Sequence, residues 1–270
     1  MRGPRYFSLS LREVEWASGE AILLAYRVLN GEDSVGVFEP GEFVLFWVPG
    51  LEAIPLTPLY AGERAVVRFY VASRGDTSGR VVVQPPVHAG MIGPLGRGFR
   101  VGAGVSRAVL VAGGTGVAAL STLSMLLREL GVRVTVFYGA RNRSLVPPLD
   151  SIVYSDKTVI ATDDGSVGLH GTVVDAVKRY VELVADAELV AAAGPPPMLC
   201  RLGMLLESLG VDWESVAFSV ESYVKCGLGF CGRCSLPCGS NHLLCREGSF
   251  VSGGLLQCWL RSVCGEYAGG

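Results

Sequence analysis

Residues 1–102 alternate short apolar runs with polar and turn-forming residues. Apolar runs occupy residues 21–28, 43–48, 66–72 and 80–84. Runs of this length, bounded by glycine, proline and aspartate, are typical of β-strands, and Pro40-Gly41 and Pro49-Gly50 break the chain between them. Because no helical period separates these runs, the pattern predicts a small antiparallel barrel over residues 1–102.

The pattern changes near Arg107, where buried strands begin to alternate with amphipathic helices. We predict strands at residues 108–112, 133–138, 159–162 and 189–192, and helices at 117–130, 172–184 and 197–209. Strands that alternate with helices indicate a doubly wound parallel sheet, which we assign to residues 103–214. A short strand at 216–220 then leads into a third region, residues 215–270.

Composition and charge exclude several classes of protein. The formal net charge is −2 and no block of Lys or Arg occurs, which argues against nucleic acid as a partner. The uncharged run from Ala108 to Leu127 has the length of a membrane span, but glycines interrupt it and a strand, a turn and a helix explain it better. Charged residues follow the N-terminus too soon for a signal peptide. We therefore expect a cytoplasmic protein without a membrane span.

The cysteines are concentrated near the C-terminus. The chain has eight, of which none precedes Cys200 and seven lie from Cys226 to Cys264. A secreted disulfide scaffold would be short and would carry a leader. The distribution instead indicates a local metal or redox module in residues 215–270.

The spacing of the first three cysteines in this module indicates an iron–sulfur cluster. Cys226, Cys231 and Cys234 have the C-x4-C-x2-C spacing of plant-type ferredoxins, and Cys245 can be the distant fourth ligand of a [2Fe–2S] cluster. Glycines between them permit positive φ angles, so that backbone N–H groups can point toward the sulfurs. Cys238 is a competing fourth ligand.

Zinc is the alternative occupant of this cysteine module. Zinc sites favour two C-x2-C pairs, and the module has only one.

The remaining cysteines have simpler interpretations. We expect Cys200 in the core, and Cys258 and Cys264 in a terminal helix, as buried thiols or in a disulfide.

Two glycine- or proline-rich turns follow predicted strands and open helices. Gly113, Gly114, Thr115 and Gly116 form the first turn, where a pyrophosphate could approach the backbone and the helix dipole would favour its charge. The turn lacks the G-x-G-x-x-G pattern, so by itself it is a weak signal. The second turn begins at Gly194-Pro195, also at the carboxyl end of a strand, where such sheets bind ligands. Ordinary strand–helix connections are the alternative.

The predicted barrel contains candidate flavin contacts at the ends of its strands. These candidates are Pro55, Leu56, Thr57, Arg68, Tyr70, Gly75, Thr77 and Ser78. By composition alone they are hydroxyls and turn residues of an ordinary barrel surface. The three histidines are scattered, and we predict no catalytic acid–base residues.

Taken together, these segments resemble the ferredoxin–NADP reductase superfamily. Within it, the chain is most similar to the iron–sulfur/FAD electron-transfer subunits of two-subunit dihydroorotate dehydrogenase. The resemblance extends over almost the whole chain and is carried by the two turns, the cysteine loop and residues 40–50, 93–99, 162–166 and 244–248.

The resemblance implies cofactors and a role for each candidate. Pro55, Leu56 and Thr57 would face the isoalloxazine of FAD, and Gly75, Thr77 and Ser78 would hold its pyrophosphate. Gly114, Thr115, Gly116, Gly194 and Pro195 would line an NAD site, and Cys226, Cys231, Cys234 and Cys245 would bind the [2Fe–2S] cluster. Electrons would pass from an FMN-containing catalytic dehydrogenase subunit, in a hetero-oligomer of pyrimidine biosynthesis, through the cluster and FAD to NAD+.

The chain departs from the family pattern at several positions. Ile54 stands where the flavin motif has a basic residue, and Val71 where serine is expected. Cys238 and the cysteine-bearing tail after Gly253 are also unusual.

Some alternatives stay open at this stage. Arg141 and Arg143 follow the second predicted strand and could accept the 2′-phosphate of NADP, although the resemblance favours NAD. The partner could instead be a sulfite reductase, a hydrogenase or an NADH-ferredoxin:NADP transhydrogenase. A protein of another class, a non-redox module that binds zinc and a nucleotide, is the further alternative.

Overall fold

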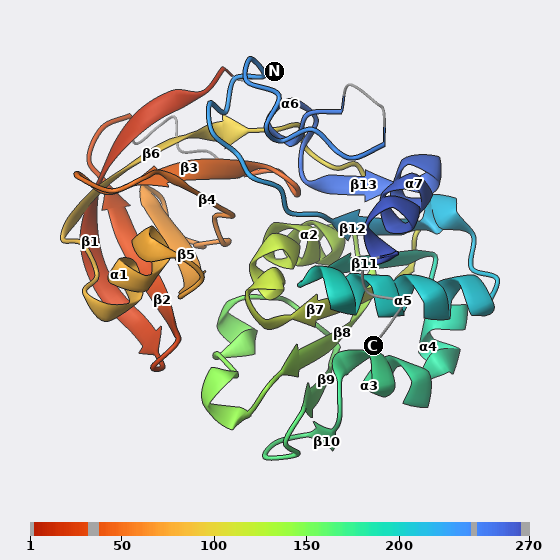
Figure 1. The fold of residues 1–270 in the computed structure, drawn as a ribbon. Coiled ribbons are helices and arrows are strands. Elements are labelled where there is room, and N and C mark those ends of the chain that lie inside the picture. Colours follow the sequence, from red (N-terminus) through yellow and green to blue (C-terminus); the bar gives the residue numbers. More distant parts are fainter. Residues whose placement is uncertain (1–2, 32–37, 239–241, 266–270) are drawn as a thin grey trace.

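Two sheets lie side by side, and the cysteine-rich segment runs across both at one end (Figure 1). This arrangement comes from a computed structural model, which describes residues 3–31, 38–238 and 242–265. Within these residues, no helix combines the length and the apolar character that a membrane span requires.

The first sheet is antiparallel and curls into a half-barrel. Its strands are β1 (Arg5–Ala17), β2 (Ala21–Val28), β3 (Phe43–Trp47), β4 (Ile54–Leu56), β5 (Val66–Ala72) and β6 (His88–Leu95), in the order β4-β3-β6-β1-β2-β5. Aromatic rings fill its inner face: Phe46 lies with its centroid 5.7 Å from that of Tyr26 and 5.3 Å from that of Phe69. The predicted antiparallel flavin-type barrel is thus confirmed as a curled sheet.

One predicted strand of this region is wrong. Residues 80–84 belong largely to helix α1 (Asp76–Val83), in which Val81 is buried against the sheet and Val83 is 85% exposed. The run of valines resembles a strand, but the preceding turn starts a helix: the Ser78 hydroxyl accepts hydrogen bonds from the backbone N–H groups of Arg74 and Gly75, both at 3.0 Å. Strands β1 and β6 were not among the predicted runs.

The second sheet has the doubly wound topology that the sequence predicts. Its strands are β7 (Arg107–Gly113), β8 (Arg133–Ala140), β9 (Lys157–Thr162), β10 (Leu169–His170), β11 (Leu189–Ala193), β12 (Val216–Ser219) and β13 (Phe250–Ser252), in the order β10-β9-β8-β7-β11-β12-β13. All neighbours are parallel except β12 and β13. The order reverses between β7 and β11, the position at which such sheets bind ligands.

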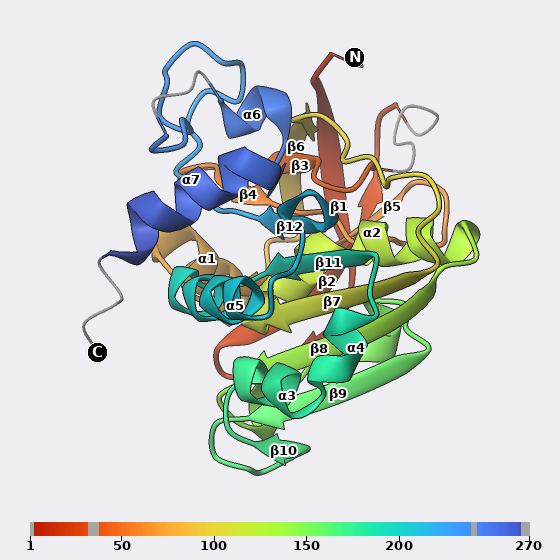
Figure 2. The same cartoon turned by 90° about the vertical axis from the view of Figure 1, so that its right-hand side faces the viewer.

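Helices cover both faces of the second sheet (Figures 1 and 2). Leu110 of β7 packs toward helix α2 (Val117–Glu129) and the half-barrel, whereas Val109 and Val111 pack toward the opposite layer. That layer contains α3 (Val173–Arg179), α4 (Val181–Ala185), α5 (Pro196–Ser208) and α7 (Gly253–Cys264). The helix predicted over 172–184 is interrupted at Tyr180, where φ is −122° and ψ is 44°. Short 3-10 turns occupy Gly114–Gly116, Arg143–Leu145, Leu149–Ser151 and Trp213–Ser215.

The cysteine-rich segment joins the two sheets. It contains the short helix α6 (Leu244–Glu247) and returns to the second sheet through β13. The N–H of Gly96 donates to the Cys245 carbonyl at 3.0 Å, and the N–H of Ser249 donates to the Gly41 carbonyl at 3.0 Å. These bonds fix the segment on loops of the half-barrel. The second sheet includes strands on both sides of the cysteine loop, so the division of the chain at 102 and 214 stays a prediction.

Candidate cofactor cleft and cysteine cluster

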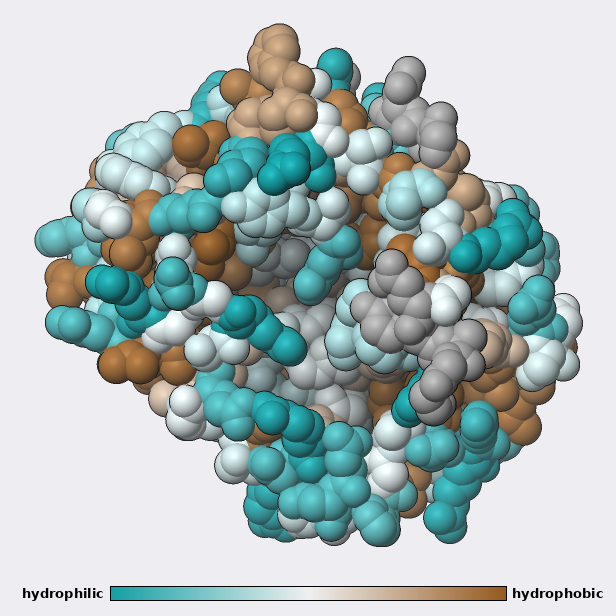
Figure 3. Space-filling model, in the orientation of Figure 1, coloured by the Kyte–Doolittle hydropathy of each residue, from teal (hydrophilic) through white to brown (hydrophobic). Residues whose placement is uncertain are grey.

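A cleft of about 860 Å³ opens between the two sheets, and Figure 3 shows the face of the molecule hollowed there. On the half-barrel side, it is lined by β4 with the loop before it and by the end of β5 with the start of α1. On the other side, it is lined by the turns after β7 and β11 and by the chain between β12 and the cysteines. Its volume lies at the upper end of the usual range for small-molecule sites. The cleft is thus large enough for an extended cofactor.

Three helices direct their N-termini into this cleft. The lining includes Gly75 and Asp76 at the start of α1, Gly116 at the start of α2, and Pro195 and Pro196 at the start of α5. The free N–H groups and the dipole at a helix N-terminus favour anions. Two of these termini follow β7 and β11, the strands between which the sheet order reverses. The cleft is therefore suited to phosphate groups, such as the pyrophosphates of FAD and NAD.

Close backbone packing explains the glycines of the turn after β7. A Cβ atom on Gly116 would lie 2.2 Å from the Ala193 carbonyl oxygen, and one on Gly113 would lie 2.5 Å from the Met198 sulfur. Any side chain at these positions would push the two turns apart. The glycine turn and the Gly194-Pro195 turn thus form one wall of the cleft.

Most of the predicted flavin contacts line the cleft. Pro55, Leu56, Thr57, Tyr70, Gly75, Thr77 and Ser78 all do so. The Thr77 hydroxyl donates to the Glu52 carbonyl oxygen at 2.9 Å, which ties α1 to the loop before β4. Burial raises the pKa of Tyr70 to about 12, so this phenol stays protonated at neutral pH.

Arg68 is an exception among the predicted contacts. It lies outside the cleft lining. Its buried guanidinium is ion-paired with Glu15 and donates to the carbonyl oxygens of Tyr60 at 3.1 Å and Ser151 at 2.6 Å. Because neighbouring groups already engage its donors, Arg68 stabilises the junction of the two sheets.

Most of the residues predicted for the nucleotide site also line the cleft. Gly114, at a φ of +53°, lies beside the lining, whereas the others are part of it: Gly113, Thr115, Gly116, Gly194 and Pro195.

The cleft lining includes charged residues that were not predicted as contacts, among them Arg74 and Glu221. Arg74 precedes the start of α1, and its Nη2 would lie 3.9 Å from a Cβ on Gly114, so it stands between two of the helix N-termini. Glu221 lines the cleft beyond β12 and is exposed to solvent there; desolvation by the surrounding protein raises the pKa of its carboxyl, and the charge of Arg74 opposes that shift. The sequence offered a signal for Arg74, because it is a basic residue directly before a predicted phosphate-binding turn. It offered no signal for Glu221.

The four predicted cluster ligands meet as two contacting pairs. The Cys231 thiol lies close enough to Cys226 to affect its pKa, and the Cys234 thiol likewise lies close to Cys245. The N–H of Leu228 donates to the Cys226 sulfur at 3.4 Å; this bond, with others from the same loop, lowers the pKa of that thiol to about 6. Burial raises the pKa of Cys245 to about 12.

The two pairs differ in their surroundings. Cys231 is exposed and Cys226 is half-buried, whereas Cys234 and Cys245 are buried. The N–H of Leu244 donates to the Cys234 carbonyl at 3.1 Å, and Leu244 also lines the cleft. One pair thus faces the surface and the other lies on the side of the cofactor cleft.

Among the described residues, no group of three or more His, Cys, Asp or Glu side chains is placed to hold a metal ion. A [2Fe–2S] cluster needs four thiolates, two on each iron, and two pairs of cysteines match that requirement. Gly227, Gly229 and Gly232 all have positive φ, between 68° and 80°, as the loop requires. The competing ligand Cys238 contacts α7 instead.

Comparison with known proteins finds relatives that match most of the chain. It is 34% identical over 232 residues to a probable dihydroorotate dehydrogenase B (NAD(+)) electron transfer subunit of Methanocella arvoryzae, covering 85% of this chain and 84% of that one. The proteins of the same name from Pyrococcus furiosus and Archaeoglobus fulgidus are 33% and 34% identical over 80% and 77% of this chain, and over 80% and 84% of their own lengths. No family model matches the sequence.

Solved structures share the fold at lower sequence identity. An NADH-dependent reduced ferredoxin–NADP oxidoreductase chain superposes with a TM-score of 0.75 at 22% identity, covering 96% of this chain and 93% of that chain. The FAD/NAD-binding domain of a nitric oxide dioxygenase from Vibrio cholerae gives 0.65 at 17% identity, over 80% and 98%. These likenesses show that the half-barrel and the parallel sheet together form a ferredoxin-reductase-like fold.

Proposed function

This chain belongs to the family of dihydroorotate dehydrogenase B electron-transfer subunits, and we propose that it carries electrons from a catalytic dehydrogenase subunit through a [2Fe–2S] cluster and FAD to NAD+. The observation that supports the proposal is that the cofactor cleft and the cysteine cluster adjoin each other. A cleft with three helix N-termini ends at Leu244, and the next residue, Cys245, belongs to the buried cysteine pair.

The half-barrel side of the cleft would hold FAD. A flavin held there would supply the chemistry that links two-electron hydride transfer with a nicotinamide to one-electron transfer with an iron–sulfur cluster. The start of α1 offers the backbone N–H groups of Thr77 and Ser78 to its pyrophosphate, and Gly75 leaves room beside them because it has no side chain. Arg74 adds the positive charge that Ile54 does not supply. Pro55, Leu56 and Thr57 of the same lining give an apolar wall with one hydroxyl for the ring system.

The sheet side of the cleft would hold the nicotinamide nucleotide. The N-termini of α2 and α5 face its pyrophosphate, and Gly113 and Gly116 keep side chains out of the way. Arg141, a candidate for a 2′-phosphate, is ion-paired with Glu20, and Arg143 donates to the Ser166 carbonyl at 3.3 Å. Because both arginines already have partners, we favour NAD over NADP.

The outer cysteine pair would face the partner subunit. Beside the exposed Cys231, Phe230 is 87% exposed and Leu228 is 50% exposed. Large apolar side chains in contact with water mark protein interaction sites when they gather in one place. A partner that covers this loop would bring its own redox group next to Cys226 and Cys231, from which the inner pair leads toward the cleft.

Substitution of Phe230 tests this docking surface. We expect Phe230→Ser to weaken association with the catalytic subunit by about tenfold or more, since a buried aromatic anchor contributes about 2 kcal/mol or more. The spectrum of the isolated chain should not change. Val83→Ser, equally exposed on α1 and far from the loop, is the control. Unchanged affinity of Phe230→Ser would place the partner elsewhere.

The visible spectrum of the purified chain tests the proposed function as a whole. We expect flavin bands together with iron–sulfur absorbance, and bleaching of the flavin by NADH under anaerobic conditions. Reduction should be faster with NADH than with NADPH. A colourless protein with stoichiometric zinc would overturn the proposal in favour of a non-redox module, and faster reduction by NADPH would overturn the choice of nucleotide.

A further inference from the structure

The cysteines outside the cluster set also form pairs. Cys200 of α5 and Cys264 at the end of α7 form a disulfide that joins positions 64 residues apart. Cys238, in the cysteine loop, and Cys258, in the middle of α7, are the two that remain, and their thiols lie close enough to interact. All eight cysteines of the chain thus lie in contacting pairs.

The contact between Cys238 and α7 extends over about two turns of the helix. The Cys238 sulfur lies 4.0 Å from the Leu255 carbonyl oxygen, and it also contacts the Cys258 thiol and the Ser262 hydroxyl. Residues three and four apart share one face of a helix, so 255, 258 and 262 form a single stripe. Cys238 therefore lies over the middle of this stripe, with Cys258 directly beneath it.

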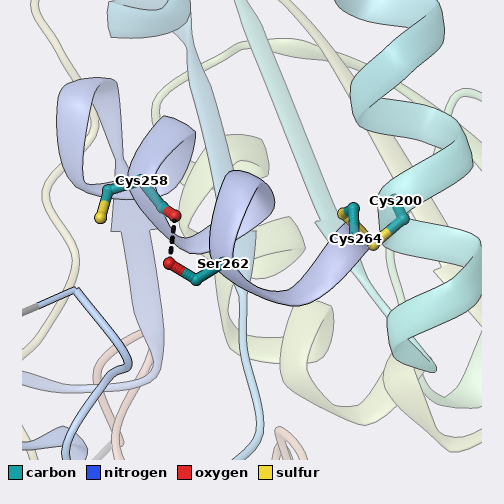
Figure 4. The surroundings of a disulfide bond; sticks show 4 residues. All are labelled: Cys200, Cys258, Ser262 and Cys264. Carbon is teal, nitrogen blue, oxygen red and sulfur yellow. Dashed lines mark hydrogen bonds between the residues drawn. A yellow bond between two sulfur atoms is a disulfide. The ribbon is translucent and has the colours of Figure 1, made fainter. Parts of the chain in front are cut away.

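The same helix is attached on its other side to the nucleotide-binding sheet. Figure 4 shows the Cys258 sulfur pointing away from the Cys200–Cys264 disulfide. Ser262, whose hydroxyl donates to the Cys258 carbonyl at 2.9 Å, lies between them on the helix. Helix α7 is thus placed to connect the cysteine loop on one side with α5 on the other.

We propose that Cys238 and Cys258 are a second disulfide site, which ties the cluster loop covalently to α7 and through Cys264 to α5. Both thiols are half-buried, so a small reagent can reach them. With a low-molecular-weight disulfide as oxidant, one thiolate attacks it and releases the first small thiol, forming a mixed disulfide. The other cysteine then attacks the protein sulfur of that mixed disulfide and releases the second small thiol. One disulfide is formed, one is consumed, and the two thiol protons pass to the released thiols.

This bond would have two consequences for the loop. It would keep the Cys238 sulfur on α7, which leaves Cys245 as the fourth ligand of the adjacent site. It would also restrict the loop in the unfolded chain, which is the usual way in which a crosslink stabilises a protein. Burial and the contact with Cys258 raise the pKa of Cys238 to about 11, so formation of the bond will be slow at neutral pH.

Peptide mapping of the full-length protein tests the proposal. Trypsin cuts after Arg233, Arg246 and Arg261, which places Cys238 in the peptide 234–246 and Cys258 in 247–261. After incubation with glutathione disulfide and alkylation of free thiols, we expect these two peptides to be crosslinked. The intact protein should be lighter by about 2 Da, the mass of the two hydrogen atoms lost. The peptides that contain Cys200 and Cys264 are an internal positive control for the mapping.

Variants distinguish the bond from cluster ligation. We expect Cys238→Ser and Cys258→Ser each to abolish the crosslink, to keep the iron content, and to speed iron loss to a chelator several-fold on heating, as the untied loop opens more often. Alkylation of both residues under oxidising conditions would overturn the bond, and crosslinking of Cys238 to another cysteine would do the same. Loss of iron in Cys238→Ser alone would identify it as a ligand. A protein that binds no iron can still show the crosslink, so this result does not depend on the proposed function.

Discussion

The second sheet and the cysteine loop differ in how they hold their shape. Strand β11 has five consecutive residues of which none is more than 5% exposed, and each of its neighbours is paired with it in parallel. Between residues 220 and 243 the only buried hydrophobic side chains among those described are Val220, Val224, Cys234 and Leu236, and the one strand-like contact is the isolated bridge between Ser235 and Leu243.

The difference shows two sources of order within one chain. The sheet is stabilised by apolar burial and by a regular backbone ladder, which the sequence supplies without help. The loop buries little, so we expect its order to depend on its cysteines, through metal ligation or through sulfur contacts. We therefore expect substitutions in the sheet to change the stability of the whole protein, and substitutions in the loop to change only the loop and its cysteine site.

Removal of one thiol from the outer pair should have the largest effect. We expect Cys231→Ser to abolish the iron–sulfur absorbance, because a [2Fe–2S] cluster needs four ligands and the alcohol is a poor replacement for a thiolate. Flavin content and bleaching by NADH should persist, since the cleft is built from other segments. Absorbance and iron analysis measure the first part. Loss of NADH bleaching with FAD still bound would contradict the independence of the two sites.

Removal of core volume from the second sheet should lower global stability. Leu202 of α5 is fully buried, so Leu202→Ala should cost about 2–5 kcal/mol in the free energy of unfolding. Met204 on the same helix is 50% exposed, and Met204→Ala should change it by less than about 0.5 kcal/mol. Chemical denaturation followed by circular dichroism measures both. Equal effects would mean that α5 packs differently from the structure described.

The charge of Arg74 should affect the cleft without affecting the fold. We expect Arg74→Ala to weaken FAD binding by about 10–100-fold, the effect of losing charge-assisted hydrogen bonds of about 1.5–3 kcal/mol. Arg133→Ala, on the exposed start of β8, is a control that should bind FAD normally. Flavin fluorescence on titration gives the affinities. An unchanged Kd in Arg74→Ala would show that the phosphate groups are held by the helix N-termini alone.

The smallest expected effect concerns the pH dependence of stability. Desolvation by the protein around the cleft raises the pKa of Glu221, so the folded state binds a proton more tightly than the unfolded state does; because the residue is exposed, solvent screens this effect and keeps it small. Its contribution to stability is therefore fully present below the ordinary glutamate pKa and is lost as pH rises through the raised value. Glu221→Gln should remove this slope from melting temperatures measured between pH 4 and about 7. A slope that is the same in the variant would assign it to another group.

Local sequence patterns predicted much of the architecture. They failed where the same pattern of residues is compatible with both a strand and a helix. The alternation of strands and helices after Arg107 identified the parallel sheet because each element has a distinct period. Residues 80–84 were assigned to a strand because three valines are compatible with a strand or with one face of a short helix. The hydroxyl and glycine at Gly75–Ser78 decided for the helix.

The candidate site shows the same limit at the level of single residues. Arg68 was a plausible flavin contact by its place on a strand, but its side chain points to Glu15 and the other sheet. Arg74, a few residues later, lines the cleft instead. Which of two nearby arginines faces a ligand depends on which neighbours satisfy its donors, and these neighbours lie far away in the sequence.

The sequence by itself determined those chemical features that depend on residues close together in the chain. The ferredoxin-type cysteines, the glycine turn before α2 and the order of the regions all follow from residues close together in the chain, because tight loops and helix termini are local structures. Only the tertiary structure decided how the eight cysteines divide: two contacting pairs in the cluster loop, the bond between Cys200 and Cys264, and the contact of Cys238 with Cys258. The physical reason is that a sulfur has many possible partners within a sequence, and the packing of α7 between the loop and α5 brings only one of them within reach.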